Sequence, residues 1–298
     1  YWAALRVAHA ANDYERVFTM GQLAITAFSI AGFQLGIARA YNALSVASLF
    51  MGRLDAAETY VETALAIYTT LGHVRGMSAA LTNAGNIALD GRSDAASARA
   101  HYERALAMVL RVGNDALAGI THGNLAEAEF AAREYDACER SATAAIERFQ
   151  RSRSVGMLAW QHQLLSRVWI ARHELAKAHE QLRVALEFRR QGPQPGYVAL
   201  CAETTARWLM RSGFLDKTAF AMPLARRLRA ARRIPGLGPA GAETRSDAGF
   251  LSRRLSAPTI ERAIEEAANV DPVALPEVLE ALLGSTMVEA PGGEELIQ

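Results

Sequence analysis

The sequence repeats a pair of small side chains, seven residues apart, at intervals of 40 or 41 residues. The pairs are Val17 and Ala24, Ala57 and Ala64, Ala98 and Ala105, Cys138 and Ala145, Ala178 and Ala185, and Thr218 and Ala225. The clearest copy of the repeat runs from Gly52 to Leu65. A repeat this regular constrains the fold more than any single residue does, because it predicts a stack of similar units.

Each repeat is predicted to be a helical hairpin. Seven residues make about two turns of α-helix, so each pair lies on one helix face, where small side chains let a neighbouring helix approach closely. A second helical pattern precedes each pair. The breaks between the two fall near Asn12-Asp13 and at Gly52-Arg53, Asp90-Gly91-Arg92, Arg133-Glu134, Arg172-His173 and Ser212-Gly213. The hairpins are expected at residues 1–30, 37–71, 77–112, 117–151, 155–191 and 197–233.

The unit resembles a tetratricopeptide repeat (TPR). The matching residues in first helices are Tyr41, Leu44 and Ser45, then Leu81, Ala84 and Gly85, and then Asn124-Leu125-Ala126. Those in second helices are Gly52, Leu54, Asp55 and Ala57, and Glu134-Tyr135-Asp136-Ala137-Cys138. The usual TPR period is about 34 residues and that of HEAT and armadillo repeats about 40–47. TPR is preferred because the small-residue pattern fits it and no proline precedes Pro193.

The long-period form of the repeat resembles TPR arrays of bacterial signalling proteins, such as large ATP-dependent regulators of the maltose-activator and LuxR type. The resemblance covers about residues 1–230. It implies an all-α fold, a right-handed superhelical solenoid of about six TPR-like hairpins followed by a small C-terminal helical element. A single hairpin cannot bury its apolar face, but a stack of hairpins can.

The chain is expected to divide into a solenoid at 1–233, a linker at 234–250, a short helical element at 251–289 and a tail at 290–298. Proline and glycine residues mark the linker. In the helical element, Ser256 can cap a helix that has Pro258 in its first turn and runs to about Val270. A second helix is expected to begin at Asp271-Pro272 and to end at Gly284.

The sixth hairpin is degenerate, because Thr218 replaces the first alanine and Pro223 falls inside the second helix. It ends in the arginine-rich run Arg226–Arg233. Terminal repeats of solenoids are atypical and have a polar outer face, so the run is interpreted as part of a capping repeat. The alternative is a phosphate or nucleic-acid site, although no aromatic side chains are interleaved with the arginines.

Composition indicates an ordinary soluble chain with a net charge of +1, which gives no overall attraction to nucleic acid or anionic lipid. Lysine occurs only at Lys177 and Lys217, as in proteins from GC-rich bacteria. Cys138 and Cys201 do not form a disulfide framework, so the cytoplasm is the expected compartment. No membrane span is expected. Because Tyr1 already lies inside a helical pattern, an upstream effector domain is expected to be missing from this chain.

The sequence holds no motif that would predict catalysis. It lacks the phosphate-binding glycine loops GxxxxGK[ST] and GxGxxG, the HExxH zinc motif and the GxSxG nucleophile elbow. The seven histidines are scattered. The prediction is therefore a chain that is not an enzyme and that has no cofactor and no metal.

By its resemblance to TPR proteins, the chain is expected to bind a ligand on the concave face formed by its first helices. The residues mapped there are Arg39, Asn42, Val46, Leu49, Asn83, Asn86, Asn124, Glu127, Phe130, Trp160, Gln163, Arg167, Glu203 and Arg207. An asparagine amide can both donate to and accept from a peptide backbone, and arginine can bind a carboxylate through two hydrogen bonds. Alternatively, Asn83 and Asn124 bond between neighbouring hairpins, and Trp160 is a core residue.

The predicted function is a non-catalytic module that binds a protein or peptide, as the sensor or scaffold part of a larger bacterial signalling or transcription regulator. A ligand that prefers one curvature of the stack would shift its conformational population. The first alternative is a stand-alone TPR adaptor that assembles a protein complex. The second is nucleic-acid binding through Arg226–Arg233.

Overall fold

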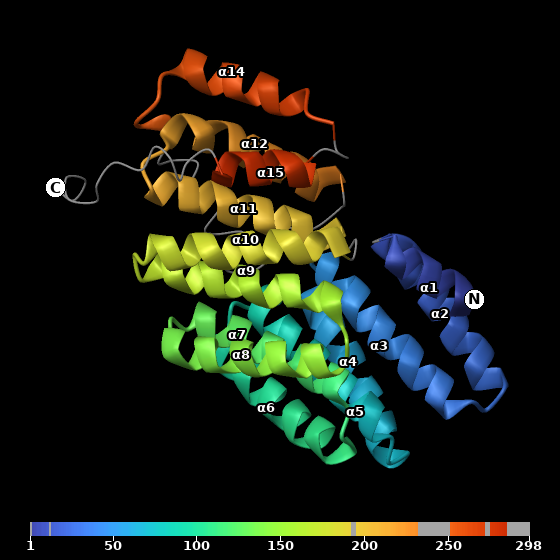
Figure 1. Cartoon of the computed structure of the whole chain (residues 1–298). Coiled ribbons are helices and arrows are strands. Elements are labelled where there is room, and N and C mark those ends of the chain that lie inside the picture. The colour runs from blue at the N-terminus through green and yellow to red at the C-terminus, as the bar shows by residue number, and fades with distance from the viewer. Residues whose placement is uncertain (1, 12, 192–194, 232–250, 272–274, 285–298) are drawn as a thin grey trace. The chain divides into compact units, whose positions relative to one another are not determined.

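The computed structural model describes residues 2–11, 13–191, 195–231, 251–271 and 275–284, and every regular element in these residues is a helix (Figure 1). The described residues divide into two compact units. Unit 1 comprises those up to Arg148, and unit 2 those from Phe149 onward. None of the described helices is both long and apolar enough to span a membrane.

Unit 1 contains four helical hairpins. Their helices are α1 (Trp2–Ala10) with α2 (Tyr14–Ile30), α3 (Gln34–Phe50) with α4 (Leu54–Thr70), α5 (Val74–Asn86) and its extension η1 (Ile87–Gly91) with α6 (Ala95–Val112), and α7 (Asp115–Ala131) with α8 (Tyr135–Arg151), whose last residues belong to unit 2. The expected hairpins are confirmed, and the first helices α3, α5 and α7 begin two or three residues earlier than the sequence predicted.

Unit 2 contains two more hairpins and two further helices. The helices are α9 (Val155–Ala171) with α10 (Leu175–Gln191), α11 (Pro195–Arg211) with α12 (Leu215–Ala231), and then α14 (Ala257–Ala268) and α15 (Leu275–Gly284). Pro223 lies inside α12, as the sequence indicated. The all-α repeat architecture predicted from the spacing of small residues is therefore confirmed.

The repeated small residues form the seam of each hairpin. Both members of every pair are buried, from Val17 and Ala24 in α2 to Thr218 and Ala225 in α12. Small side chains at these positions let the two helices of a hairpin pack closely, while larger residues such as Tyr102 and Leu182 fill the space beside them. The 40-residue pattern thus identifies the residues at which the backbones approach each other.

Left-handed residues end the helices with the same period. Within hairpins they are Gly52, Ser93, Arg133, His173 and Gly213, and between hairpins they are Gly32, Gly72, Gly113 and Arg153. A residue in this conformation stops a helix and lets the chain reverse, and glycine adopts it without steric cost. Four of these turns nevertheless use side chains other than glycine.

The single step of 41 residues has a structural cause in the third hairpin. Its first helix ends in the π-helical turn η1, so that α5 and η1 together hold 13 + 5 residues, whereas α3, α7, α9 and α11 hold 17 each. A π-turn accommodates one extra residue without breaking the helix. The break predicted at Asp90-Gly91-Arg92 is accordingly displaced, because Asp90 and Gly91 still belong to η1.

The glycines at two junctions between hairpins have two different uses. Gly72 has a φ of +62°, whereas Gly76, at the start of α5, faces the ring of Tyr68. A Cβ atom on Gly76 would lie 2.3 Å from that ring. Gly32 and Gly36 repeat this arrangement one hairpin earlier. These two junctions therefore combine a residue that turns the chain with one that lets an aromatic ring cover the next helix.

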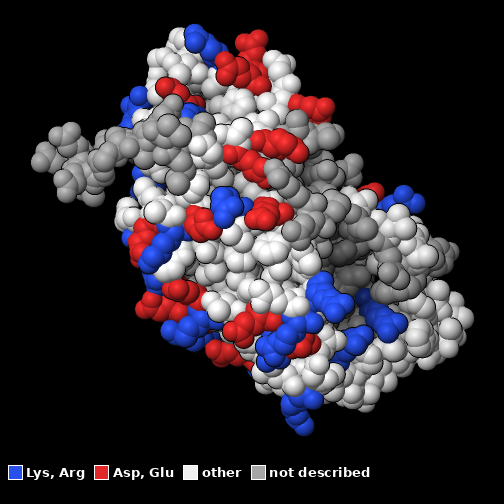
Figure 2. Space-filling model, viewed as in Figure 1, with Lys and Arg blue, Asp and Glu red and all other residues white. Residues whose placement is uncertain are grey.

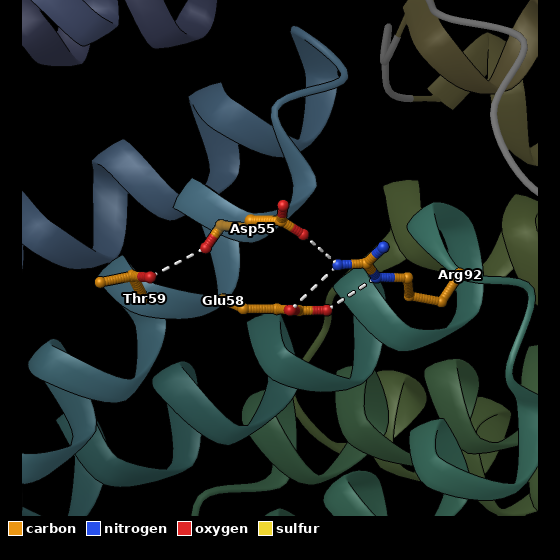
Figure 3. A network of polar contacts seen from close by, with 4 residues as sticks. All are labelled: Asp55, Glu58, Thr59 and Arg92. Atoms are coloured by element: carbon orange, nitrogen blue, oxygen red, sulfur yellow. Dashed lines mark hydrogen bonds and ion pairs between the residues drawn. The ribbon is translucent and has the colours of Figure 1, made fainter.

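Arg92 ties the third hairpin to the second (Figure 3). It lies in the turn after η1, and its guanidinium donates to Asp55 and Glu58 in the first turns of α4. The Nε–Oε1 distance to Glu58 is 2.9 Å. Because the groups are exposed, the contact fixes the orientation of the turn more than it stabilises the fold.

The two C-terminal helices pack on the hairpins of unit 2. Ser256 caps α14, whose C-terminal end is held by Arg227 of α12, since Arg227 Nη1 donates to the carbonyl oxygens of Ala267 and Val270. The second helix begins at Leu275, later than the predicted start at Asp271-Pro272. The predicted linker at 234–250 and the tail at 290–298 lie outside the described residues.

Candidate peptide-binding groove

The first helices of unit 1 enclose a groove of about 560 Å³. Its lining residues, from α1, α3, α5 and α7 and from the end of α4, are Leu5, Arg39, Asn42, Ala43, Val46, Tyr68, Ser78, Ala79, Thr82, Asn83, Leu117, Ile120 and Thr121. Ligand sites typically measure roughly 300–1,000 Å³. The groove is therefore large enough for several side chains of a ligand.

Two asparagines meet in the groove. Asn83 Nδ2 in α5 donates to Asn42 Oδ1 in α3 over 3.0 Å, and both side chains are half-buried. Within the described part of the chain, Asn83 Oδ1 and Asn42 Nδ2 make no further hydrogen bond. The pair therefore links two hairpins, as the alternative interpretation of Asn83 held, and keeps one acceptor and one donor for a ligand.

Arg39 provides the charge of the groove. Its side chain is exposed, and it is the one charged residue among the lining residues named above. Burial raises the pKa of Tyr68, and the nearby charge of Arg39 partly offsets that rise. In Figure 2, acidic and basic side chains are interspersed over the left of the face in view, whereas several basic side chains lie together at the lower right. The positive charge of the groove is thus local to Arg39.

The rest of the lining is apolar or internally satisfied. Val46, Leu117 and Ile120 are half-buried apolar residues of the wall. The hydroxyls of Thr82 and Thr121 donate to backbone carbonyls of their own helices, 3.0 and 2.9 Å away. The groove therefore combines an apolar wall with a few polar groups, the composition expected of a ligand site.

The structure brings Arg39, Asn42, Val46 and Asn83 together in the groove. The other predicted residues of unit 1 lie elsewhere. Leu49 is buried in the core of the second hairpin, Asn86 accepts a hydrogen bond from the Tyr102 hydroxyl over 2.8 Å, and the ring of Phe130 lies 5.7 Å from that of Tyr135. Asn124 and Glu127 are half-buried and are not part of the lining.

Sequence reasoning missed the contribution of α7, which is made by Leu117, Ile120 and Thr121. The residues predicted in that helix, Asn124, Glu127 and Phe130, begin about one turn closer to its C-terminus. The repeat gave the correct helix, but only the packing of α7 against its neighbours determines which turn faces the groove.

A second group of polar residues surrounds the π-turn. Burial raises the pKa of Asp90 to about 6, and the negative charge of Glu127 adds to the rise. Burial also raises the pKa of Tyr102, which donates to Asn86. No group of three metal-ligating side chains suited to an ion occurs in the described residues.

The predicted residues of unit 2 are buried or bonded within the unit. Trp160, Gln163 and Arg167 are buried, and Gln163 Nε2 donates to Thr204 Oγ1 over 2.6 Å. Glu203 accepts two hydrogen bonds from Arg229, both of 2.7 Å. Glu203 and Arg207 line a cavity of only about 10 Å³, which has room for about one water molecule.

The arginine run is partly used in packing. Arg227 binds the end of α14 and Arg229 binds Glu203. Arg226 is exposed and lines the small cavity, whereas Arg232 and Arg233 lie outside the described residues. Two arginines of the run therefore have structural partners, in agreement with the capping interpretation.

Solved structures of several proteins are similar to this one. A Rap protein complexed with Competence and Sporulation Factor matches with a TM-score of 0.62 and 12% identity, over 88% of this chain and 74% of that one. BtubC from P. vanneervenii matches with a TM-score of 0.58 and 17% identity, over 74% and 93% of the two chains. The apo form of RapI matches with a TM-score of 0.55 and 13% identity, over 85% and 99%.

These likenesses show that the chain has the helical-repeat fold of the Rap structures. At such low identity they show the fold alone. No protein-family model and no curated protein sequence matches this chain.

Proposed function

We propose that this chain is a non-catalytic module that binds a peptide or an extended protein segment in the groove of unit 1. The observation that carries the proposal is the Asn42–Asn83 pair, which lies in a groove of about 560 Å³ and keeps a free acceptor and a free donor. One acceptor beside one donor is the arrangement that pairs with a backbone peptide group. Such a pair binds peptides without requiring a particular side chain.

The flanking residues define the rest of the ligand. A carboxylate, at the C-terminus or on an acidic side chain, pairs with Arg39. An apolar side chain packs against Val46, Leu117 and Ile120. The preferred ligand is therefore a short peptide that carries one negative charge and one sizeable apolar side chain.

The similar Rap structure that contains Competence and Sporulation Factor supports this proposal, because it has the same fold and a bound factor. In its finer form, the proposal is that the chain is the cytoplasmic sensor or scaffold part of a larger bacterial signalling or transcription regulator, as its long-period TPR pattern favours. A ligand that prefers one arrangement of the hairpins would then shift the population toward it.

The test is selection of linear peptides by the full chain from a random library with free C-termini. The affinity of a selected peptide is then measured by fluorescence anisotropy, with and without amidation of its C-terminus. Arg39→Ala and Asn83→Ala should each weaken binding about 10-fold, in line with the loss of one charged or polar contact. Arg75→Ala is the matched control, because Arg75 is an exposed arginine that does not line the groove.

The proposal fails if the selected peptides bind the Arg39→Ala and Asn83→Ala proteins as tightly as the unaltered chain while circular dichroism shows an intact fold. Substitutions in unit 2 identify the location of the site independently. Peptides whose binding is unaffected by both substitutions but is lost with a substitution in unit 2 would move the ligand site out of this groove.

A further inference from the structure

Helix α15 is docked on the solenoid rather than stacked as a further repeat. It packs against α10 and α11 and, in Figure 1, lies in front of the row that α10, α11, α12 and α14 form. The side chains of Leu279 and Leu283 are only 0% and 3% exposed, and they join the core to which Leu186 of α10 and Cys201 of α11 belong. The surface of α10 and α11 therefore already accepts one amphipathic helix.

This surface extends beyond the end of α15. A cavity of about 390 Å³ adjoins the last turn of the helix. Its lining residues are His179, Arg183, Leu186 and Glu187 from α10, and Glu280, Leu283 and Gly284 from α15. Of the residues that the structure describes, none fills this space, so the ten residues of α15 occupy only part of the site.

His179 provides a second, independent sign of an incomplete site. Its side chain is only 7% exposed and its ring centroid lies 4.9 Å from that of Trp208, yet its Nε2 atom has no hydrogen-bond partner among the described residues. Buried polar atoms in folded proteins nearly always have a partner. The same histidine lines the cavity, so a ligand that enters the cavity can supply the missing hydrogen bond.

The docking of α15 is balanced between opposing contributions. Burial of Leu279 and Leu283, with Val278 and Leu282 partly buried against the same core, favours it. Fixing a ten-residue helix opposes it, because a helix this short is marginal on its own. The two contributions are of comparable size, so α15 can undock without unfolding the hairpins. A competing helix with one additional contact would then displace it.

We propose that the α10–α11 surface is a second binding site, which accepts an amphipathic helix from a partner protein, and that α15 is its built-in occupant. The partner helix carries two leucines four residues apart, as α15 does at Leu279 and Leu283, and continues for about one turn beyond the end of α15. Its extra turn carries a basic or hydrogen-bond-donating side chain.

The charges around the cavity define that side chain. Glu187 of α10 contributes a carboxylate that stays in place when α15 leaves the site, and it interacts with Arg183. Arg183 is paired with Glu180 over 3.0 Å. A lysine or arginine on the extra turn would therefore lie near Glu187 and could donate to His179 Nε2. This site lies in unit 2 and does not depend on the groove of unit 1.

The test uses the full chain with Leu279→Asp and Leu283→Asp, which keeps α15 from docking. One labelled probe has the sequence of residues 271–284, and a second adds a four-residue turn of three alanines and one lysine. By anisotropy, the altered chain should bind the first probe at least 10-fold more tightly than the unaltered chain, in which tethered α15 competes. The extended probe should bind a further 3- to 10-fold more tightly, and His179→Leu should remove that gain alone.

Two controls define the site. Ile264→Asp on α14 replaces an exposed apolar residue of a helix outside the site and should leave binding unchanged. A probe with aspartate in place of both leucines should not bind. If the altered chain keeps its helical signal but binds the probes no better than the unaltered chain, the proposal is overturned.

Two further outcomes also decide the proposal. Binding of the short probe with no gain from the extension would limit the site to a helix of the length of α15 and would overturn the longer partner helix. Should the altered chain fail to fold, hydrogen exchange of the unaltered chain is measured instead. Amides of α15 that exchange faster than those of α11 support the proposal, and equally slow exchange in the two helices overturns it.

Discussion

The two units place the same kind of contact at the same repeat position, but in different surroundings. In unit 1, the ninth residue of α3, Asn42, pairs with the tenth residue of α5, Asn83. In unit 2, the ninth residue of α9, Gln163, pairs with the tenth residue of α11, Thr204. Each pair spans 41 residues of sequence. The first pair faces a groove of about 560 Å³, whereas the second is buried.

The difference follows from the neighbouring side chains. Small residues such as Ala43 and Ala79 line the groove of unit 1 and leave it open. In unit 2, Glu203 and Arg229 form an ion pair with side chains only 7% and 16% exposed, and the nearby cavity measures about 10 Å³. The repeat thus determines where polar side chains meet, and the size of the residues around them determines whether a ligand can reach them.

The buried polar contacts of unit 2 are tested most strongly at Glu203. Glu203→Ala removes the carboxylate that Arg229 binds through two hydrogen bonds, and should lower the free energy of unfolding by about 3–5 kcal/mol. Asn83→Ala in the open groove should cost only about 1 kcal/mol, since a half-exposed hydrogen bond is lost. Urea denaturation measures both values. Equal losses would mean that the two units do not differ in the way described.

The common architecture of the units is tested at the hairpin seams. Ala57→Leu in unit 1 and Ala185→Leu in unit 2 insert a larger side chain at fully buried positions, and each should cost about 1–3 kcal/mol. Thermal denaturation followed by circular dichroism compares the two proteins with the unaltered chain. An unchanged melting temperature for either one would remove that residue from the seam.

Two buried groups, one in each unit, should respond to pH in opposite directions. The folded pKa of Asp90 in unit 1 is raised to about 6 from 3.8, so its contribution to stability is fully present below pH 3.8 and is lost as the pH rises through 6. Burial lowers the pKa of His162 in unit 2, so its contribution is present above about pH 6.5 and is lost as the pH falls through the folded value.

Asp90→Asn removes the first of these effects. Between pH 4 and 6 the unaltered chain should lose stability from this group with a slope of at most about 1.4 kcal/mol per pH unit, and the Asp90→Asn chain should lack that slope. Urea denaturation at several pH values gives the slopes. His162→Gln is the comparison in unit 2 and should leave the Asp90 slope intact. A slope that persists in the Asp90→Asn chain would assign it to another group.

Sequence alone was sufficient for the architecture, because the physical requirement behind it recurs every 40 residues. Residues such as Ala57 and Ala185 must be small for the helices of a hairpin to meet, and this restriction is visible in the sequence. The π-turn at Ile87–Gly91 appeared only as one step of 41 residues. A one-residue insertion can be absorbed by a turn or by a helix, and spacing does not distinguish the two.

The groove was predicted less completely, for a different reason. Arg39, Asn42 and Val46 of α3 and Asn83 of α5 line it, and the resemblance to TPR proteins had mapped all four to the first helices. Glu203 was mapped in the same way, but its environment depends on Arg229, which lies 26 residues later on a second helix. Such contacts between helices determine whether a ligand can reach a side chain. They leave no periodic pattern in a single sequence.

The smallest predicted effect concerns the turns within the hairpins, where the units can be compared residue by residue. Gly52 and Arg133 in unit 1, and His173 and Gly213 in unit 2, all have a positive φ. A side chain in this conformation costs about 1–2 kcal/mol, whereas glycine loses about 0.5–1 kcal/mol more backbone entropy on folding. Arg133→Gly and His173→Gly should therefore each stabilise the chain by about 0.5–1 kcal/mol.

The reverse substitutions supply the control. Gly52→Ala and Gly213→Ala should destabilise the chain by about 1 kcal/mol each, because alanine must then adopt the left-handed conformation. Arg133 and His173 are exposed, so the loss of their side chains removes little packing. If Arg133→Gly stabilises the chain and His173→Gly does not, the turn of unit 2 depends on a contact of the histidine ring. If neither Arg133→Gly nor His173→Gly stabilises the chain, backbone strain does not limit the stability of these turns in either unit.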